Sequence, residues 1–351
     1  MKALTYSGPQ DVRVVDVPDA KPADELGAVV QVSAAGVCGS DLHVYAGHGF
    51  SHDTGYCVGH EAVGEVVEVE SEVRRFAVGD RVLLPASIGC AWCATCARGH
   101  VVACEHRREP WKEFCYGMSQ RLPGCQAEAV AVPHADMNML RVPAGVTDDT
   151  AILLTDNAPT AWYGARRARI TPGDVVAVIG LGPVGQLAVQ SAFLMGAARV
   201  LAADPVDHRR AWAVEHGAEP VDPTDPKASI KELTAGEGCD AVIEAVGADE
   251  TIALAVSAAR QAGRVSVIGV SRNGAFPFRM EAAQTKELEF AIGLCSAQRE
   301  LPALISLAAA GRLAPDRLIT HRWGLSEGPA AYAMLAARTG GVGKVVLDPA
   351  R

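Results

Sequence analysis

The sequence lacks the features of a nucleic-acid-binding, secreted or membrane-anchored protein. It contains no run of basic residues, and its 41 acidic against 32 basic side chains give a net charge of -9 at pH 7. That charge repels a phosphate backbone or an anionic membrane surface, so we expect neither as a partner. The opening residues, MKALTYSGPQDVRVV, contain no apolar signal region. We therefore expect a cytoplasmic protein.

Long hydrophobic runs are scarce as well. Residues 175–198 form the one stretch without charged residues that is long enough to cross a bilayer. Four glycines and a proline divide this stretch into a β-branched run, VVAVIG, and a separate helix-like segment. A strand buried on both faces has this composition, so we predict no membrane span here.

Cysteine is too sparse for a disulfide-built scaffold, because ten thiols are spread over 351 residues. Four of them nevertheless cluster as Cys90, Cys93, Cys96 and Cys104, in a C-x2-C-x2-C-x7-C array. This array can place four thiolates on one tetrahedral ion, so we predict a structural zinc in a lobe at about residues 88–106. Four unliganded thiols are the alternative, but packing alone gives no reason for three cysteines at every third position.

The length and the changing pattern of the chain indicate two domains. The first 150 residues hold short strand-like runs, such as AVVQVSAAGV and EAVGEVVEVE. From about residue 160, strand-like runs alternate with helix-like stretches, which predicts a parallel, doubly wound sheet. This alternation stops near residue 293, and we expect the remaining residues, which end in the strand-like run GKVVL, to rejoin the first domain.

Four further residues carry metal-binding chemistry but are scattered along the chain: Cys38, His60, Glu61 and Asp156. Taken singly, a buried cysteine is more often a small hydrophobe, and a histidine is more often a hydrogen-bonded core or surface residue. The residues alone leave open whether the four form one site.

A glycine-rich turn, GLGPVG, lies between the run VVAVIG and a helix-like stretch. Gly180, Gly182 and Gly185 allow a tight turn and a close approach of the backbone to a pyrophosphate at the helix N-terminus. We include Pro183 and Val184 in this predicted cofactor site. A glycine-rich turn that holds no ligand is the alternative.

The acidic residue that ends the next strand-like run predicts the cofactor. The carboxylate of Asp204 can accept hydrogen bonds from an adenosine ribose and would repel a 2'-phosphate, which favours NAD over NADP. Arg209 instead favours NADP, because an arginine at this position can bind the 2'-phosphate.

Together these motifs resemble the zinc-dependent medium-chain alcohol dehydrogenases over essentially the whole chain. The likeness depends on CGSDLH, on GHEAVGEVVEVE followed by VGDRV, on the four-cysteine lobe and on GLGPVG with its distal aspartate. The resemblance implies an α/β fold in which a GroES-like, β-rich catalytic domain (1–157) is interrupted by a Rossmann domain (158–293) and completed by residues 294–351. It also implies NAD and two zinc ions per subunit, one catalytic and one structural.

The resemblance assigns roles around the catalytic zinc. Cys38, His60 and Asp156 match the ligands, although many members have a cysteine in place of this aspartate. Glu61 matches a glutamate that completes the zinc shell in some members and stands back in others, and a buried acid paired with a cation is the alternative. Asp41 matches a carboxylate that orients the zinc-bound histidine.

Ser40 and His43 match the proton relay of the family, which passes through the ribose of the cofactor. Capping of a short helix is the alternative for the polar residues after Cys38. The remaining predicted cofactor residues are Val246, Val270, Leu294 and two basic ones, Arg209 at the ribose and Lys344 near the phosphates. Surface solvation explains the two basic residues about as well.

The function that the resemblance implies is reversible hydride transfer between a primary or secondary alcohol and NAD, with an aldehyde or ketone as the oxidised partner. A polyol, threonine-type or formaldehyde dehydrogenase is left open, as is a non-catalytic nucleotide-binding protein. Candidate pocket residues, each more readily explained by packing, are Tyr45, Phe50, Ala86, Trp111 and Leu294. The resemblance also implies a homo-oligomer, a tetramer rather than a dimer, because bacterial members of the family are commonly tetramers. The apolar segments AFPFRM and ELEFAIG, near the expected sheet edge, agree with a homo-oligomer.

Overall fold

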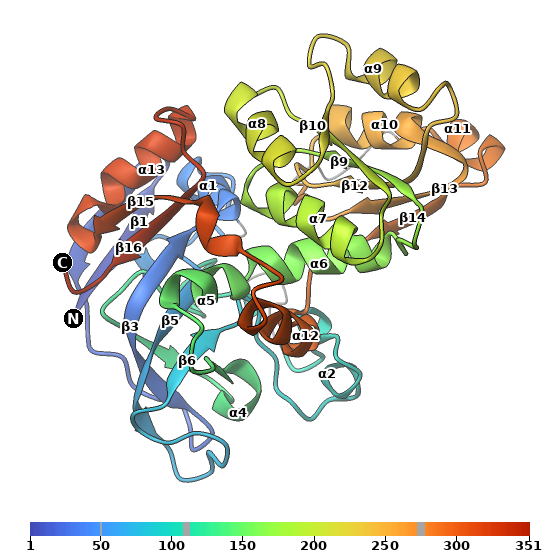
Figure 1. Ribbon diagram of the computed structural model, residues 1–351. Helices are drawn as coiled ribbons and strands as arrows, with labels where there is room; N and C mark the ends of the chain where they lie inside the picture. Colours follow the sequence, from blue (N-terminus) through green and yellow to red (C-terminus); the bar gives the residue numbers. More distant parts are fainter. Residues whose placement is uncertain (50, 108–112, 272–277) are drawn as a thin grey trace. The chain divides into compact units, whose positions relative to one another are not determined.

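The computed structural model describes residues 1–49, 51–107, 113–271 and 278–351 (Figure 1). The chain divides into two compact units, Met1–Pro159 with Ser296–Arg351, and Thr160–Cys295. The boundaries expected from the sequence, after residues 157 and 293, lie two residues earlier in each case. The candidate phenylalanine and tryptophan of the pocket, Phe50 and Trp111, lie outside the described residues.

The first unit is rich in strands. Its strands are β1 (Lys2–Gly8), β2 (Asp11–Asp16), β3 (Ala28–Val37), β4 (Tyr56–Cys57), β5 (Glu61–Val69), β6 (Arg81–Leu84), β7 (Ala129–Val132), β8 (Leu140–Arg141), β15 (Ile319–Gly324) and β16 (Lys344–Asp348). Its helices are α1 (Gly39–Tyr45), α2 (Ala94–Ala97), η1 (Val101–Ala103), α4 (Ala135–Asn138), α5 (Asp148–Leu154), α12 (Ala297–Ala309), η2 (Pro315–Leu318), η3 (Leu325–Glu327) and α13 (Gly328–Ala337).

A seven-stranded sheet organises this unit, in the order β15-β16-β3-β5-β6-β8 with β7 beside β3. A second sheet has the order β2-β1-β4. The long central strand β3 is mostly buried because it pairs with β5, β7 and β16. Residues 296–351 belong to this unit because β16 pairs antiparallel with β3, with Val345 opposite Val37.

The second unit contains β9 (Val175–Ile179), α7 (Pro183–Leu194), β10 (Arg199–Ala203), α8 (Asp207–Glu215), β11 (Glu219–Pro220), α9 (Pro226–Leu233), β12 (Cys239–Glu244), α10 (Asp249–Ala258), β13 (Ala259–Val267), α11 (Met280–Thr285) and β14 (Glu289–Ile292). Helix α6 (Asn157–Arg167) begins in the first unit and ends in the second. All six strands are parallel, in the order β11-β10-β9-β12-β13-β14. Figure 1 shows α7 and α10 on opposite sides of this sheet.

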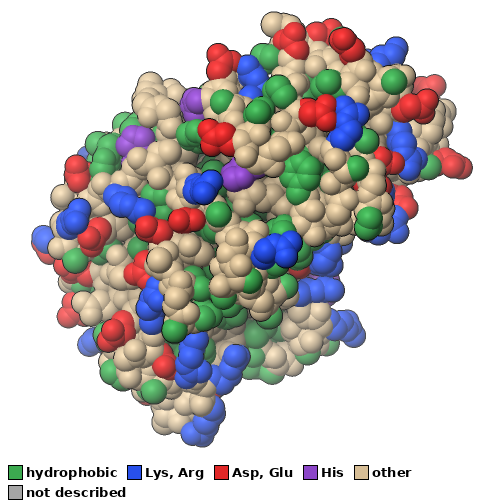
Figure 2. Space-filling model, viewed as in Figure 1, with side chains coloured by type: hydrophobic (Ala, Val, Ile, Leu, Met, Phe, Trp, Pro, Cys, Tyr) green, Lys and Arg blue, Asp and Glu red, His purple; other side chains and the backbone are tan. Residues whose placement is uncertain are grey.

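This arrangement confirms the predicted α/β fold with a doubly wound parallel sheet. The strands β9, β10, β12 and β13 are buried because their β-branched and aliphatic side chains form the core between the helices. Residues 175–198 fold into β9 and α7, and across the described ranges every helix is too short or too polar to cross a membrane. On the face drawn in Figure 2, acidic and basic side chains are mixed over the upper and left parts, and basic ones predominate toward the lower right.

Candidate active site

Helix α1 begins at Gly39, directly after the candidate ligand Cys38. Cys38 has an extended backbone and is the N-cap of the helix. Asp41, in the first turn of the helix, accepts a hydrogen bond from the Cys38 backbone N–H through Oδ2, at 2.9 Å. The other carboxylate oxygen, Oδ1, lies 2.9 Å from Nδ1 of His60. Asp41 is only 1% exposed, so one buried carboxylate both caps α1 and holds the imidazole ring.

The scattered metal-ligand candidates come together in the first unit. Asp156 Oδ2 lies 3.6 Å from Cys38 Sγ and 3.7 Å from His60 Nε2. One ligand atom from each of these residues and one from Glu61 all lie within 4.8 Å of one another. Bond lengths of about 2.0–2.3 Å around a tetrahedral zinc place two ligand atoms roughly 3.3–3.8 Å apart. The spacing of Cys38, His60 and Asp156 fits such an ion.

Glu61 lies beside these three residues, and both of its carboxylate oxygens already have partners. Oε1 accepts a hydrogen bond from Nδ2 of Asn157 at 2.9 Å, and Oε2 forms an ion pair with Nζ of Lys344. On the neighbouring strand, Gly36 stands opposite Glu61, and a Cβ atom there would lie 1.8 Å from Oε2. Glycine therefore leaves the space that the carboxylate occupies.

Lys344 has a partner that was not predicted. Its side chain is 1% exposed and pairs with the fully buried Glu61. Strand pairing explains this contact, because Gly36 of β3 stands between Val346 of β16 and Glu61 of β5. Lys344 and Glu61 are thereby brought together across the sheet, so that Glu61 is a buried acid paired with a cation in this structure, and the role of Lys344 near the cofactor phosphates stays a prediction.

The charges at this site are mutually dependent. Burial raises the pKa of Glu61, an effect that Lys344 and His60 oppose. Burial lowers the pKa of Lys344, but Glu61 and Cys38 outweigh it and the pKa is raised. Burial also acts to raise the pKa of Asp156, but His60 lowers it below its ordinary value. Three of the candidate ligands can carry a negative charge: Cys38, Glu61 and Asp156. Lys344 offsets the charge of Glu61, and a divalent cation would balance the other two.

The two predicted relay residues lie on α1. Ser40 and His43 are three positions apart, which puts them on the same side of the helix, and both are half-buried. Ser40 Oγ lies 3.2 Å from Nε2 of His60, the nitrogen that also faces Asp156. The hydroxyl is thus next to the space that the ligand atoms surround.

The pocket candidates of the first unit pack against other residues. Tyr45 lies against the buried Tyr332, with ring centroids 5.4 Å apart, and Ala86 is buried. Both observations agree with the packing role that the sequence analysis favoured for these residues.

Asn157 was not among the predicted site residues, although it follows Asp156 directly. Its buried side chain donates to Glu61 and lies 3.4 Å from Asp156 Oδ2 and 3.8 Å from Cys38 Sγ. The amide nitrogen therefore touches three of the four candidate metal ligands. Its adjacency to Asp156 was the one available signal.

Gln126 was missed as well, and nothing in the sequence around it indicates a role. Its Nε2 donates to the carbonyl of Gly36 at 2.9 Å and lies 3.5 Å from Asp41 Oδ2. The hydroxyl of Tyr332 donates to its Oε1 at 3.0 Å. Gln126 thus supports the carboxylate that holds His60.

The four clustered cysteines form a second candidate metal site. Their sulfur atoms lie within 4.8 Å of one another, and all four side chains are buried. The backbone N–H of Cys93 donates to Cys90 Sγ at 3.4 Å, and that of Cys96 donates to Cys93 Sγ at 3.3 Å. Backbone donors from Glu105 and Cys96 lower the pKa of Cys93 to about 6. Four thiolates at this spacing match the donor set of a closed structural zinc site.

In the second unit, the glycine-rich turn has the geometry of an anion-binding loop. Gly180 follows β9 with a φ of 88°, a conformation that glycine adopts without strain. Gly182 is the N-cap of α7, which begins with Pro183 and Val184 and has no side-chain cap. A Cβ at Gly185 would lie 1.8 Å from the carbonyl oxygen of Gly180. The turn therefore requires glycine at positions 180 and 185. It leads into a helix N-terminus whose backbone N–H groups have no side-chain cap.

Asp204 follows the next strand, β10, and is tied to this turn. Its Oδ2 accepts from the backbone N–H of Leu181 and its Oδ1 from that of Val206, both at 2.8 Å. Nη1 of Arg209 lies 3.7 Å from Oδ2. Arg209, the predicted partner of a 2'-phosphate, is thus directed at the carboxylate of Asp204.

Three predicted cofactor residues follow adjacent parallel strands: Val246 after β12, Val270 after β13 and Leu294 after β14. With Gly180 after β9, they lie at the carboxyl edge of the sheet, where nucleotides bind in this class of fold.

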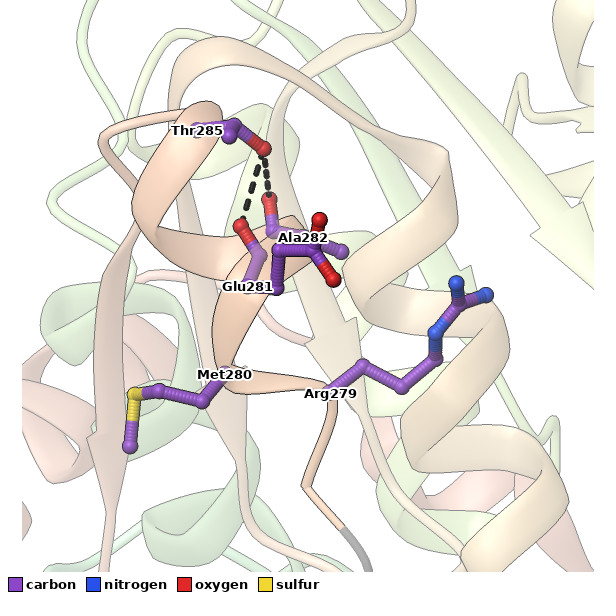
Figure 3. Close-up of a pocket in the computed structure, with 5 residues that line it drawn as sticks. All are labelled: Arg279, Met280, Glu281, Ala282 and Thr285. Atoms are coloured by element: carbon purple, nitrogen blue, oxygen red, sulfur yellow. Dashed lines mark hydrogen bonds between the residues drawn. The ribbon is translucent and has the colours of Figure 1, made fainter.

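A shallow hollow beside α11 lies away from all these residues. It is lined by Arg279, Met280, Glu281, Ala282 and Thr285 (Figure 3). The Thr285 hydroxyl donates back to the carbonyls of Glu281 and Ala282, at 2.9 and 3.2 Å. None of the predicted site residues borders the hollow, and we assign no role to it.

Comparison with known proteins decides the family. The model of the alcohol dehydrogenase GroES-like domain matches residues 24–144, and that of the zinc-binding dehydrogenases matches residues 183–310. "Probable zinc-binding alcohol dehydrogenase Rv1895" of Mycobacterium tuberculosis is 40% identical over 97% of this chain and 86% of its own length. The chain belongs to the zinc-dependent medium-chain alcohol dehydrogenases. Its membership confirms the resemblance, and with it an oxidoreductase family that binds zinc.

Solved structures agree with this assignment. The alcohol dehydrogenase TADH from Thermus sp. ATN1 has a TM-score of 0.92 and 35% identity, with 99% of each chain covered. A zinc-binding dehydrogenase from Sinorhizobium meliloti 1021, solved with bound NADP, has a TM-score of 0.84 and 28% identity, again with 99% of each chain covered.

Proposed function

We propose that this dehydrogenase transfers a hydride reversibly between a primary or secondary alcohol and NAD, in the cytoplasm. The spacing of Cys38, His60 and Asp156 carries the proposal, because it suits three ligands of one tetrahedral zinc. Glu61 has other partners, which leaves the fourth position for a substrate oxygen. A catalytic zinc site needs such an open position.

Each residue of the site has a task in the reaction. Zinc bound there supplies Lewis-acid activation of the alcohol, which lowers the pKa of the hydroxyl. Asp41 accepts a hydrogen bond from Nδ1–H of His60, so that the unprotonated Nε2 would face the metal. Ser40 would accept the proton of the substrate hydroxyl, and His43 would carry it onward by way of the cofactor's ribose. A bound nicotinamide would supply the acceptor for the hydride of the carbinol carbon.

The second unit would hold the cofactor. The N-terminus of α7 would receive the pyrophosphate, and Asp204, which lies beside this turn, would accept hydrogen bonds from the adenosine ribose. Since Arg209 is directed at Asp204, we favour NAD over the NADP that the Sinorhizobium relative binds. Val246, Val270 and Leu294 complete this cofactor site at the edge of the sheet.

A second zinc at Cys90, Cys93, Cys96 and Cys104 holds the lobe and takes no part in the chemistry. We also propose a homo-oligomer, a tetramer rather than a dimer. Strand β14 ends the sheet of the second unit and exposes Ile292, and an edge of this kind is commonly covered by another strand.

The proposal is tested by following NADH formation with a panel of primary, secondary, polyol and amino alcohols and hydrated formaldehyde, on protein whose zinc has been counted. We expect two zinc ions per chain and the highest kcat/KM for a simple alcohol with NAD. Preference for a polyol, for threonine or for formaldehyde would replace the substrate class. No activity together with an empty Cys38 site would favour a non-catalytic nucleotide-binding protein.

A further inference from the structure

The side chain of Asn157 is placed among the candidate metal ligands as a hydrogen-bond donor. Its buried Nδ2 lies 2.9 Å from Glu61 Oε1, 3.4 Å from Asp156 Oδ2 and 3.8 Å from Cys38 Sγ. All three neighbours are acceptors when they are ionised. The reversed amide would point its oxygen at three negative groups, so these neighbours fix the amide orientation. Oδ1 has no hydrogen-bond partner among the described residues.

We propose that Asn157 is a positioning residue that keeps Glu61 out of the metal's coordination sphere and thereby leaves the fourth position open to substrate. The inference rests on the metal site of the proposed function. Asn157 binds Oε1 of Glu61 while Lys344 pairs with Oε2, so both oxygens are occupied by protein groups. A ligand atom of Glu61 is nevertheless within 4.8 Å of those of Cys38, His60 and Asp156. Glu61 is close enough to enter the site if it is released.

Loss of the amide donor changes this balance. Without Asn157, Oε1 of Glu61 would be a buried carboxylate oxygen with no donor, which is an unfavourable state. The nearest replacement partner is the metal, and coordination would fill the position that substrate needs. Lys344 alone cannot prevent this, because it pairs with the other oxygen.

The test uses protein loaded with cadmium-113, because the two sites have one and four sulfur ligands and give separate NMR resonances. In Asn157→Leu, which has a similar size and no donor, we expect the Cys38-site resonance to shift upfield as a further oxygen joins. The resonance of the four-cysteine site stays in place. In the zinc enzyme we expect KM for the alcohol to rise about ten- to hundredfold, by analogy with the loss of metal affinity or activity when a partner of a metal ligand is removed. KM for NAD should change less than threefold.

Two further variants separate this role from general destabilisation. Asn157→Ser removes the long-reaching donor with a residue that is tolerated at a helix N-terminus, and it gives the same upfield shift. Asn138→Leu is the matched control, because Asn138 is a buried amide of the same unit that donates to the carbonyls of Gly89 and Pro133. It lowers stability but leaves the Cys38-site resonance unmoved.

The outcomes are distinct. An unmoved resonance in both Asn157 variants overturns the proposal, as does an equal shift in Asn138→Leu. A shift that persists in Asn157→Leu combined with Glu61→Gln shows that Asn157 does not act through Glu61, and also overturns it. Absence of any resonance from the Cys38 site in the unaltered protein refutes the metal site itself and with it the proposed function.

Discussion

Replacing Lys344 by methionine tests whether this ammonium neutralises Glu61 inside the folded unit. Both side chains are shielded from water, with Lys344 1% and Glu61 0% exposed. Methionine keeps an unbranched apolar side chain and removes the charge. The comparison is made in a Cys38→Ser background whose zinc content has been counted, so that no ion at this site offsets the freed carboxylate. The assay is the free energy of unfolding in urea.

The expected loss is large because a charge is left unpaired in the interior. Removal of one partner of a buried ion pair costs about 3–5 kcal/mol. At roughly 2–4 °C per kcal/mol for a domain of 150–250 residues, the melting temperature falls by about 6–20 °C. Lys344→Met combined with Glu61→Gln removes both charges and recovers most of this loss.

The pH dependence has a definite sign. Burial already raises the pKa of Glu61, and without Lys344, which lowers it, the folded-state pKa rises further. The pKa in the unfolded chain is about 4.3. Between these two values the carboxyl group is protonated only when folded, so stability falls by about 1.4 kcal/mol per unit as the pH rises. The free energy of unfolding that Lys344→Met loses is therefore largest at pH 8 and becomes smaller toward pH 5.

Equal unfolding free energies with and without Lys344 at pH 8 would refute this reasoning. So would a deficit that is the same at pH 5 and pH 8, because it would come from packing and not from charge.

Three further predictions concern the two metal sites and the cofactor. Cys38→Ser abolishes alcohol oxidation, whereas His43→Ala slows it and alters the pH–rate profile. The slowing is at most the hundred- to ten-thousandfold that a positioned acid or base contributes. Equal losses of kcat/KM in the two variants would contradict this order. Cys93→Ser lowers the zinc content from two ions to one and reduces the melting temperature, and a variant that retains both ions would exclude the four-thiolate site. Asp204→Ser raises the ratio of kcat/KM for NADP over NAD at least tenfold, because it removes the carboxylate that repels the 2'-phosphate; an unchanged ratio would assign specificity elsewhere.

Much of the fold was predictable because its signals are local. The runs VVAVIG, RVLAAD, CDAVIEAVG and RVSVIGV are short and largely apolar and are separated by helix-length segments, and they form β9, β10, β12 and β13 as expected. The run GKVVL was likewise expected to be a strand and forms β16. Its partner was not predictable, because Val345 pairs with Val37 across almost the whole length of the chain.

In the site, too, the residue types could be predicted from the sequence, but their partners could not. Cys38, His60 and Asp156 could be named from their chemistry and from the family motifs. The partner of Lys344 could not, since it depends on the register of β16 and β5 on either side of β3. Asn157 is a common helix-start residue by type, and only the approach of Glu61 gives its amide a further role.

The return of the chain to the first unit has a consequence for the site. Tyr332 of α13 donates to Gln126, which turns the amide nitrogen toward Gly36 and Asp41, the residue that holds His60. Lys344 of β16, from the same return segment, pairs with Glu61. Without this segment a buried carboxylate at Glu61 would have no cation, and the amide of Gln126 would lose the donor that orients it. The candidate ligands from the first part of the chain are therefore supported by side chains that the last part of the chain supplies.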